Sequence, residues 1–268
     1  MTLVGTAAAA PRYFDSAGAA IDVALAGKPR VVAFGEYHQV KGRSTAPSAI
    51  RHFTSEILDG IAARSSDLIT ETWVPSGKCG KTEATAVAKV EETIKRPEAT
   101  ESELVTMLKR AKAQGVQPRI LSVSCEEYAQ IQPPDGQTDY VALLRIITQQ
   151  LKKNIDLARK SAKAGRMVLV YGGALHNDLF PQRELAAFSF AKAVQNETRG
   201  KYVEVDLYVP EYVEADASMV KEPWFAPWRD TEQLHPGKVA LIARSKASYI
   251  VMFPRAVSAS PADAPHTP

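Results

Sequence analysis

The stretch Arg30-Val31-Val32-Ala33-Phe34-Gly35-Glu36-Tyr37-His38 decides the fold class of this chain. A short apolar run that contains β-branched valines predicts a buried strand, and Gly35 ends the run. Residues two apart in an extended segment point to the same face, so Glu36 and His38 are expected to project together from the end of the strand. This carboxylate and imidazole form the first candidate for a functional site.

Further apolar runs alternate with helical patterns along the chain. Strands are predicted at 67–73, 119–125, 166–171 and 201–208, and helices at 15–26, 48–64, 82–95, 101–113, 140–164 and 184–195. Residues 238–244 and 248–253 flank a short polar turn and predict a β-hairpin. The alternation indicates βαβ units. The sequence therefore predicts a single α/β domain with a mostly parallel central sheet, helices on both faces and a C-terminal β-hairpin.

This domain is expected to span residues 15–255. Residues 1–14 are rich in alanine and include Pro11, which predicts a loose N-terminal arm. Residues 256–268 are rich in proline, alanine and serine, which predicts a disordered tail. The segment 222–230 is expected to be irregular because it combines aromatic residues with proline.

Composition limits the partners. The 268 residues include 33 Lys and Arg against 30 Asp and Glu, a formal net charge of +3, with no block of basic residues on one segment, so no nucleic-acid partner is expected. No apolar run reaches the ~20 residues that span a bilayer. No secretion signal is visible, so we expect a cytoplasmic protein if the chain is full length, and an exported one if a leader was removed. The sequence does not indicate the oligomeric state.

Reactive side chains fall at the carboxyl ends of several predicted strands, where ligands bind in open α/β sheets. They are Glu36, His38, Glu71, Ser124, Cys125 and His176. Two imidazoles and two carboxylates suit acid/base catalysis by a histidine that a glutamate orients, and they equally suit a divalent metal. The main candidate site is therefore Glu36, His38, Glu71 and His176, of which Glu36, His38 and His176 are the candidate metal ligands.

Several neighbours are accessory candidates, each with a plainer alternative. Cys125 could be a nucleophile, a metal ligand or a small buried residue, and a disulfide with Cys79 would favour an exported protein. His52 could lean toward the site or lie on a helix surface. Asp178 lies just after His176 in the chain and is a further accessory candidate. Tyr37 and Tyr171 flank the two histidine motifs and could ligate haem iron or simply pack at strand ends.

The same residues carry a family resemblance. Gly35-Glu36-Tyr37-His38, Leu68-Ile69-Thr70-Glu71 and Val170-Tyr171-Gly172-Gly173-Ala174-Leu175-His176 resemble, in this order, the superfamily that unites ChaN-like haem-binding proteins, erythromycin esterases and TraB/TIKI proteins. The likeness covers roughly residues 30–180 and is nearest to the ChaN-like form. Lys153-Asn154 resembles a basic-Asn pair of TIKI-type members. Gln39 stands where ChaN-like and esterase motifs usually have Asp or Gly. The motif that ends at His176 has the usual Gly-x-x-His spacing when its glycine is Gly173.

The resemblance implies an α/β fold whose site residues are Glu36, His38, Glu71 and His176. TIKI-like members are metal-dependent peptidases, erythromycin esterases open a macrolactone, and ChaN-like members bind haem and are linked to iron uptake. We therefore expect a hydrolase of a small-molecule or peptide substrate that cleaves an ester, lactone or amide, with or without Mn, Zn or Co. One alternative is a non-catalytic haem-binding protein that uses Tyr37, Tyr171 or His176. Another is a natural-product tailoring enzyme with the same site.

Overall fold

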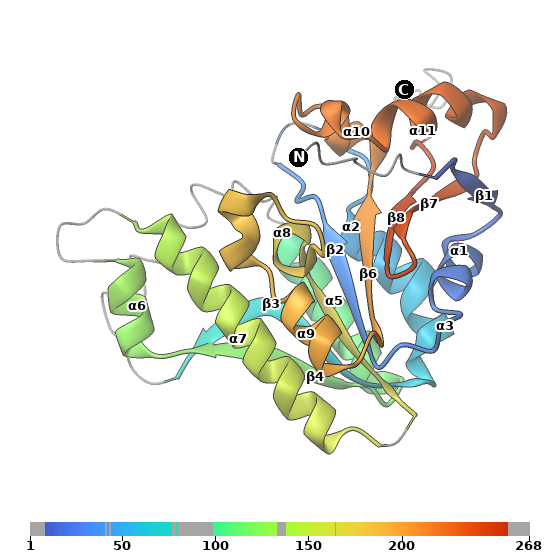
Figure 1. Ribbon diagram of the computed structural model, residues 1–268. Coiled ribbons are helices and arrows are strands. Elements are labelled where there is room, and N and C mark those ends of the chain that lie inside the picture. The colour runs from blue at the N-terminus through green and yellow to red at the C-terminus, as the bar shows by residue number, and fades with distance from the viewer. Residues whose placement is uncertain are drawn as a thin grey trace, which may run out of the picture.

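The chain folds around one sheet of eight strands (Figure 1). The computed structural model describes residues 9–40, 42, 44–76, 79, 99–132, 138–163 and 165–256. The strands are β1 (Arg12–Phe14), β2 (Val31–Glu36), β3 (Ser65–Pro75), β4 (Gln117–Val123), β5 (Met167–Gly173), β6 (Tyr202–Tyr208), β7 (Val239–Ser245) and β8 (Ser248–Met252). Their order across the sheet is β1-β7-β8-β6-β2-β5-β3-β4.

The predicted fold class is confirmed. The pairs β8–β6, β6–β2, β2–β5, β5–β3 and β3–β4 are all parallel, whereas β7 runs antiparallel to both β8 and β1. The strands β7 and β8 form the expected C-terminal hairpin. The sheet is therefore mostly parallel, with antiparallel strands only at the β1–β7–β8 edge of its described part.

Strand β2 lies inside the sheet, between β6 and β5. All six of its residues are buried. In a strand that is covered on both faces, no side chain faces solvent, so apolar and polar residues do not alternate. This explains the continuous apolar run Val31-Val32-Ala33-Phe34. Burial of a side chain such as Phe34 contributes roughly 1.5–3 kcal/mol, so this run fixes the strand firmly. Its carboxyl end therefore delivers Glu36 to a defined position.

Helices cover both faces. They are α1 (Ala17–Ala24), α2 (Ala49–His52), α3 (Leu58–Ala62), α5 (Ala99–Ala113), α6 (Cys125–Ile131), α7 (Tyr140–Ser161), α8 (Ala174–Asn177), α9 (Ala191–Glu197), α10 (Pro210–Val213) and α11 (Phe225–Thr231). Shorter turns are the π-helical η1 (Phe53–Ile57) and the 3₁₀ segments η2 (Arg183–Phe188), η3 (Met219–Lys221) and η4 (Glu232–Leu234).

The core has two main layers and a smaller third one. Helices α1, α2, α3 and α5 pack on the face that carries Val32 and Phe34, while α6, α7 and α9 pack on the face that carries Val31 and Ala33. Helices α10 and α11 cover the β7–β8 hairpin. Among the helices of the described residues, none is long and apolar enough to cross a membrane.

Some predicted elements differ from the observed ones. Arg12–Phe14, assigned above to a loose arm, pair with β7 because Phe14 packs against the core. The segment 222–230 is not irregular throughout, because Phe225–Thr231 form α11 with Trp228 buried. The predicted helix 48–64 becomes α2, η1 and α3, with a π-helical centre. The predicted helix 82–95, residues 1–8 and residues 257–268 lie outside the described residues.

Candidate functional site

The Glu36 carboxylate organises one half of the candidate site. Nδ1 of His38 lies 2.6 Å from Glu36 Oε1, and the Tyr171 hydroxyl donates to Glu36 Oε2 over 2.5 Å. Glu36 is 6% exposed and the His38 side chain is 28% exposed. The predicted projection of Glu36 and His38 to one side is therefore present, and the Glu36–His38 pair leaves the imidazole accessible from outside.

Glu71 is brought into the site by an irregularity in β3. The pairing of β3 with β4 shifts register between Thr70 and Trp73, so Glu71 lies within a bulge. A bulge twists the strand locally and re-aims its side chains. The backbone N–H of Gly173 donates to Glu71 Oε2 over 2.5 Å, which fixes the carboxylate against the end of β5.

Two glycines at the end of β5 make room for this arrangement. A Cβ atom on Gly173 would lie 2.9 Å from His38 Nε2 and 3.3 Å from Glu71 Oε2. A Cβ atom on Gly172 would lie 2.7 Å from Glu71 Oε2. Any larger residue would push one of these side chains aside. The glycines therefore let the imidazole of His38 and the carboxylate of Glu71 approach the same piece of backbone.

His176 lies on α8, directly after β5, and is 3% exposed. Its Nδ1 lies 3.1 Å from the Phe188 carbonyl oxygen and 2.9 Å from Thr148 Oγ1. A carbonyl oxygen can only accept, so the contact with Phe188 favours the tautomer that has its proton on Nδ1 and its lone pair on Nε2. That Nε2 atom lies 3.7 Å from Glu71 Oε1. The distance is too long for a direct hydrogen bond, but both atoms can bond to the same water or substrate hydroxyl.

The four predicted site residues therefore lie together at the carboxyl ends of β2, β3 and β5. Glu36 pairs with His38, His38 and Glu71 meet beside Gly173, and Glu71 faces His176. Next to Glu36 is a cavity of about 10 Å³, lined also by Gln39, Ser48 and Thr100 among others. A volume of this size accommodates about one water molecule.

The described residues do not form a ready metal site. Within this part of the chain, no group of three or more His, Cys, Asp or Glu side chains is arranged to hold a metal ion. Glu36, His38 and His176, the predicted ligands, instead use carboxylate or ring atoms in the hydrogen bonds given above. Both histidine rings make these hydrogen bonds through Nδ1, as metal-bound histidines commonly do with the nitrogen that does not bind the metal, so binding of Mn, Zn or Co stays a prediction.

The two candidate haem tyrosines are engaged elsewhere. Tyr171 is 2% exposed and donates to Glu36, while Tyr37 donates to the carboxylate of Asp216. Hydrogen bonds from Ser218 and Tyr37 lower the pKa of Asp216 to about 2. The Tyr37 contact ties the end of the β2 motif to the segment between α10 and η3. Ligation of haem iron by either phenol would require one of these bonds to break.

The accessory candidates have other partners. Cys125 forms a disulfide with Cys79, so in this form it has no thiol for nucleophilic attack or metal binding. Nδ1 of His52 lies 2.6 Å from Glu56, and its ring stacks on Phe253. Asp178 accepts a hydrogen bond from Arg244 over 2.6 Å. Asn154, of the TIKI-like pair, donates to the Gln150 carbonyl within α7.

A charged cluster next to β2 is formed by the buried carboxylates of Glu204 and Asp206 and the partly exposed side chains of Asp178 and Arg244. Asp206 is paired in register with Gly35, one residue before Glu36, and accepts a hydrogen bond from Asn177. Burial raises the pKa of Asp206 to about 6 despite the nearby Arg244 guanidinium. Burial and the charge of Asp206 also raise the pKa of Glu204. The cluster therefore contacts the residues next to Glu36 and His176 in the chain.

Sequence reasoning missed the groups that hold the histidine ring. Thr148 lies on the buried face of α7, where a polar residue within an apolar stripe was an available signal. The Phe188 carbonyl left no signal because it is a backbone group, and Asp216 left none because its contact with Tyr37 joins segments 179 positions apart in the chain.

Comparisons with known proteins give little further information. No family model and no curated protein matches the chain. It is similar to a chain described as bacterial protein toxins, with 14% identity, a TM-score of 0.36, and coverage of 72% of this chain and 37% of that one. It is also similar to RRSP, a MARTX toxin effector domain from Vibrio vulnificus CMCP6, with 15% identity, a TM-score of 0.32, and coverage of 61% and 31%. The resemblance to ChaN-like proteins and erythromycin esterases stays a prediction.

Proposed function

We propose that this protein is a hydrolase that cleaves an ester, lactone or amide bond with the Glu36, His38, Glu71 and His176 site. The observation that carries the proposal is the 3.7 Å approach of His176 Nε2 to Glu71 Oε1, with Nδ1 of the ring anchored on the Phe188 carbonyl. This arrangement aims a basic nitrogen and a carboxylate at one point. Histidine is the residue most often used for general acid–base catalysis.

In this proposal His176 removes the proton from a water molecule that also hydrogen-bonds to Glu71. The water then attacks the substrate carbonyl carbon. Glu71 is held by the Gly173 N–H, so it positions the water without having to reorganise. The carboxylate also stabilises the positive charge that develops on the imidazole of His176, as in carboxylate–histidine pairs generally.

His38 is the proposed proton donor to the leaving group. Its Nδ1 faces Glu36, which orients the ring. The ring is the more exposed of the two histidines, so the leaving group can reach it from solvent. The Tyr171 hydroxyl donates a hydrogen bond to the second oxygen of Glu36 and so fixes the orientation of this carboxylate. Two histidines, each paired with one glutamate, thus perform the two proton transfers of hydrolysis.

The experiment is a hydrolysis assay with an activated phenyl ester, a macrolactone and a fluorogenic peptide. We expect turnover of at least one of them, reduced about 10²- to 10⁴-fold by Glu71→Gln and by His176→Gln, because each change removes a proton-transfer partner. The matched control is Glu56→Gln, which alters a carboxylate that pairs with His52 outside this site. Turnover that is unchanged in both site variants would contradict the proposal.

Metal ligation and haem binding stay predictions with their own tests. Elemental analysis of the purified chain, compared with His38→Ala, tests for bound Mn, Zn or Co. Addition of hemin, followed by the Soret band in wild type, Tyr37→Phe and His176→Ala, tests for haem. A Soret band that disappears in these variants, together with absent hydrolysis, would favour the haem-binding alternative over the proposed hydrolase.

A further inference from the structure

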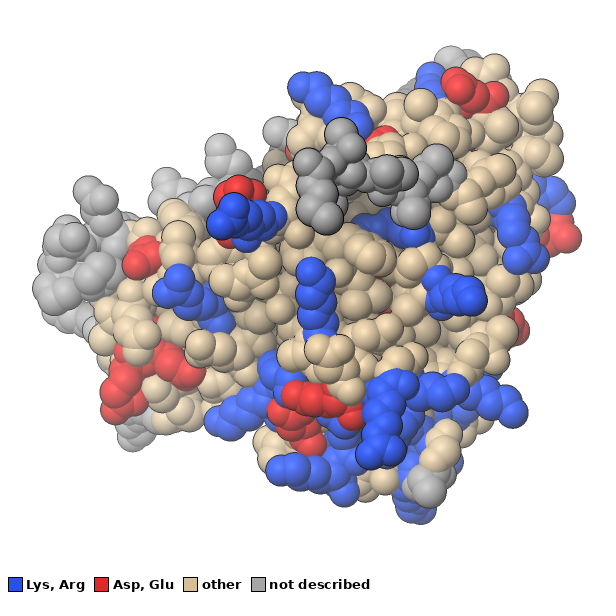
Figure 2. Space-filling model, viewed as in Figure 1, with Lys and Arg blue, Asp and Glu red and all other residues tan. Residues whose placement is uncertain are grey.

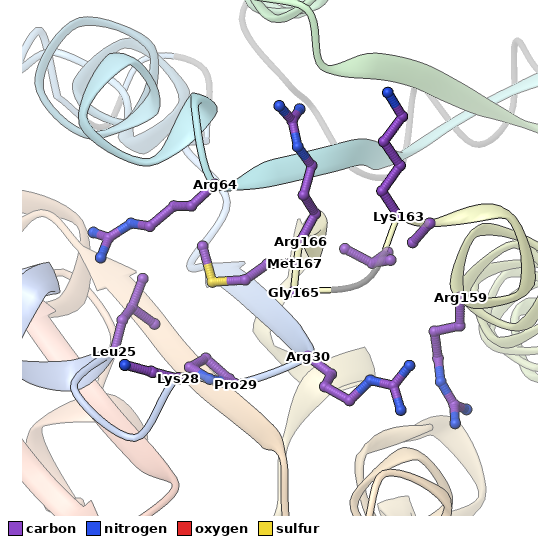
Figure 3. Close-up of a pocket in the computed structure, with 12 residues that line it drawn as sticks. Leu25, Lys28, Pro29, Arg30, Arg64, Arg159, Lys163, Gly165, Arg166 and Met167 are labelled. Carbon is purple, nitrogen blue, oxygen red and sulfur yellow. The ribbon is translucent and has the colours of Figure 1, made fainter.

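A second cavity lies at the opposite edge of the sheet from the candidate site. It has a volume of about 340 Å³ and is formed where β2, β3 and β5 begin (Figure 3). Its walls are Leu25, Lys28, Pro29, Arg30, Arg64, Arg159, Ala162, Lys163, Gly165, Arg166, Met167 and Val168. Glu36 is six residues further along β2 than Arg30, so the two sites are about 20 Å apart along the strand. This cavity is therefore separate from the proposed hydrolytic site.

The charged residues in these walls are all basic, namely Lys28, Arg30, Arg64, Arg159, Lys163 and Arg166. They come from the α1–β2 turn, the turn before β3, the end of α7 and the turn between α7 and β5. Figure 2 shows Lys and Arg gathered along the lower edge of the molecule, where the parallel strands of Figure 1 begin. The fold thus brings the basic stretch 159–166 together with Lys28, Arg30 and Arg64 in one cavity.

Part of this positive charge is uncompensated. Arg64 pairs with Asp22, and Arg159 pairs with Glu197 over 2.7 Å. Within the described part of the chain, no acidic side chain forms an ion pair with Lys28, Arg30 or Lys163. The Arg166 guanidinium donates to the backbone carbonyl of Ser65 over 3.1 Å. An anion in the cavity would supply the missing negative charge.

Two backbone features fix the main chain that carries two of these cations. The Arg30 N–H donates to the Lys201 carbonyl over 2.7 Å, and the Arg30 carbonyl accepts from the Val168 N–H over 2.9 Å. Arg30 is therefore fixed between β6 and β5. Lys28 has a φ of +49°, in the left-handed region that disfavours a residue with a side chain. A strained residue of this kind often serves a function, and here it adds a cation to the cavity wall.

We propose that this cavity binds a phosphorylated small molecule that carries two or more linked phosphate groups. A volume of this size is typical of small-molecule sites. Guanidinium groups match phosphate oxygens in pairs of hydrogen bonds, and two arginines of the cavity walls, Arg30 and Arg166, form no ion pair within the described part of the chain. A diphosphate carries enough negative charge to neutralise Lys28, Arg30 and Lys163 together.

The walls also offer a place for an uncharged part of the ligand. Leu25, Pro29, Ala162 and Met167 line the cavity between the cations. In Figure 3 the aliphatic stems surround the cavity, while the charged groups of Arg30, Arg64 and Arg166 extend from it in different directions. A nucleoside diphosphate could use both kinds of surface, whereas free pyrophosphate would use only the cations.

The test is isothermal titration calorimetry of the full chain with pyrophosphate and with ADP at moderate salt. We expect saturable binding of pyrophosphate, weakened about tenfold or more in Lys28→Gly and in Arg30→Gln, because each change removes a charge-assisted contact. Tighter binding of ADP than of pyrophosphate would identify a nucleotide ligand. Equal binding would identify the diphosphate group alone as the recognised part.

The matched control is Arg199→Gly. Arg199 also has a positive φ, of +53°, and is exposed in the turn before β6, but it does not line the cavity. Both glycine variants relieve backbone strain and remove one charge, so both should keep or raise the melting temperature. Only Lys28→Gly should lose pyrophosphate binding.

Three outcomes would overturn the proposal. The first is the absence of measurable pyrophosphate binding, and the second is equal binding by wild type, Lys28→Gly and Arg30→Gln. The third is equal or tighter binding of citrate or of a single-stranded oligonucleotide in competition with pyrophosphate, which would indicate a general anion or nucleic-acid surface. None of these measurements depends on hydrolytic activity, so failure here leaves the proposed function standing.

Discussion

The phenol of Tyr171 donates a hydrogen bond of 2.5 Å to Oε2 of Glu36, and the other oxygen of that carboxylate lies 2.6 Å from Nδ1 of His38. The three groups come from adjacent strand ends, since Phe34 and Tyr171 are partners in the β2–β5 register. A carboxylate with both oxygens engaged has one preferred orientation. The orientation of the His38 ring therefore depends on Tyr171 through Glu36.

Substitution Tyr171→Phe tests this dependence. It removes the hydrogen bond to Glu36 while the ring that packs against Phe53 remains. A hydrogen bond to a charged group contributes about 1.5–3 kcal/mol, so we expect kcat of the proposed hydrolysis to fall about tenfold or more, with a smaller change in KM. The control is Tyr249→Phe, whose exposed hydroxyl donates to the Lys246 carbonyl. An equal loss in both variants would contradict a specific role for Tyr171.

The substitution Gly173→Ala tests the close approach at the end of β5. Its added methyl group would lie 2.9 Å from His38 Nε2 and 3.3 Å from Glu71 Oε2, so one of these side chains must move. We expect circular dichroism to show a folded protein and the proposed hydrolysis to fall about 100-fold, because misplacement by about 1 Å has effects of this size.

The control for this variant is Gly60→Ala in α3. A Cβ atom there would meet nothing within 4 Å. Alanine favours helix over glycine by about 0.8–1.0 kcal/mol, so Gly60→Ala should be slightly more stable than wild type and fully active. If Gly173→Ala retained full activity, the site would not require the glycine at this position.

The sheet was predictable because its signals are local. The apolar run of β2 and the glycine that ends it give both the strand and the direction in which Glu36 and His38 project. The rule that ligands bind at the carboxyl ends of parallel strands then brings Glu71 and His176 to the same edge. Nothing beyond periodicity and topology was needed for these four residues.

The remaining features depend on tertiary contacts. The short strand β1 has only three residues and is stabilised by pairing with β7, more than 220 positions later in the chain. The bulge that aims Glu71 arises from a register shift against β4, which no local pattern encodes. The basic cavity joins Lys28, Arg64 and Lys163 from separate turns, so a search for basic blocks along the sequence could not find it.

Asp206 is expected to make stability depend on pH. Burial raises its pKa from 3.8 to about 6, so between these values the folded chain holds a proton that the unfolded chain has lost. This contribution to stability is therefore greatest below about pH 4 and falls by about 3 kcal/mol as the pH rises to about 6. Glu204, Arg244, Asp178 and Tyr208 surround the group, and the raised pKa of Glu204 acts in the same direction.

Urea unfolding of wild type and Asp206→Asn between pH 4 and pH 7 measures this contribution. The variant should show a flatter dependence of the unfolding free energy on pH in the range from 4 to 6. Asp15→Asn is the control, because Asp15 is an exposed carboxylate that pairs with Lys238 at the surface. If wild type and Asp206→Asn gave parallel curves, Asp206 would not hold the proton assigned to it.

The disulfide between Cys79 and Cys125 is expected to stabilise the fold without taking part in catalysis. Its sulfurs join the segment after β3 to the first residue of α6 and close a loop with a sequence separation of 46. For a loop of this length, the loss of unfolded-chain entropy is worth up to about 4 kcal/mol. Cys79→Ala/Cys125→Ala should therefore unfold at a lower urea concentration than wild type, while hydrolysis by the folded protein is unchanged.

A reducing agent separates the effect of the bond from the effect of the substitutions. It should lower the melting temperature of wild type to that of the double variant and leave the double variant unchanged. Peptide mapping under non-reducing conditions should recover Cys79 and Cys125 in one linked species. Such a bond persists in oxidising compartments, so its recovery from the native source would favour export. Two freely titrating thiols in the native protein would contradict both the bond and that location.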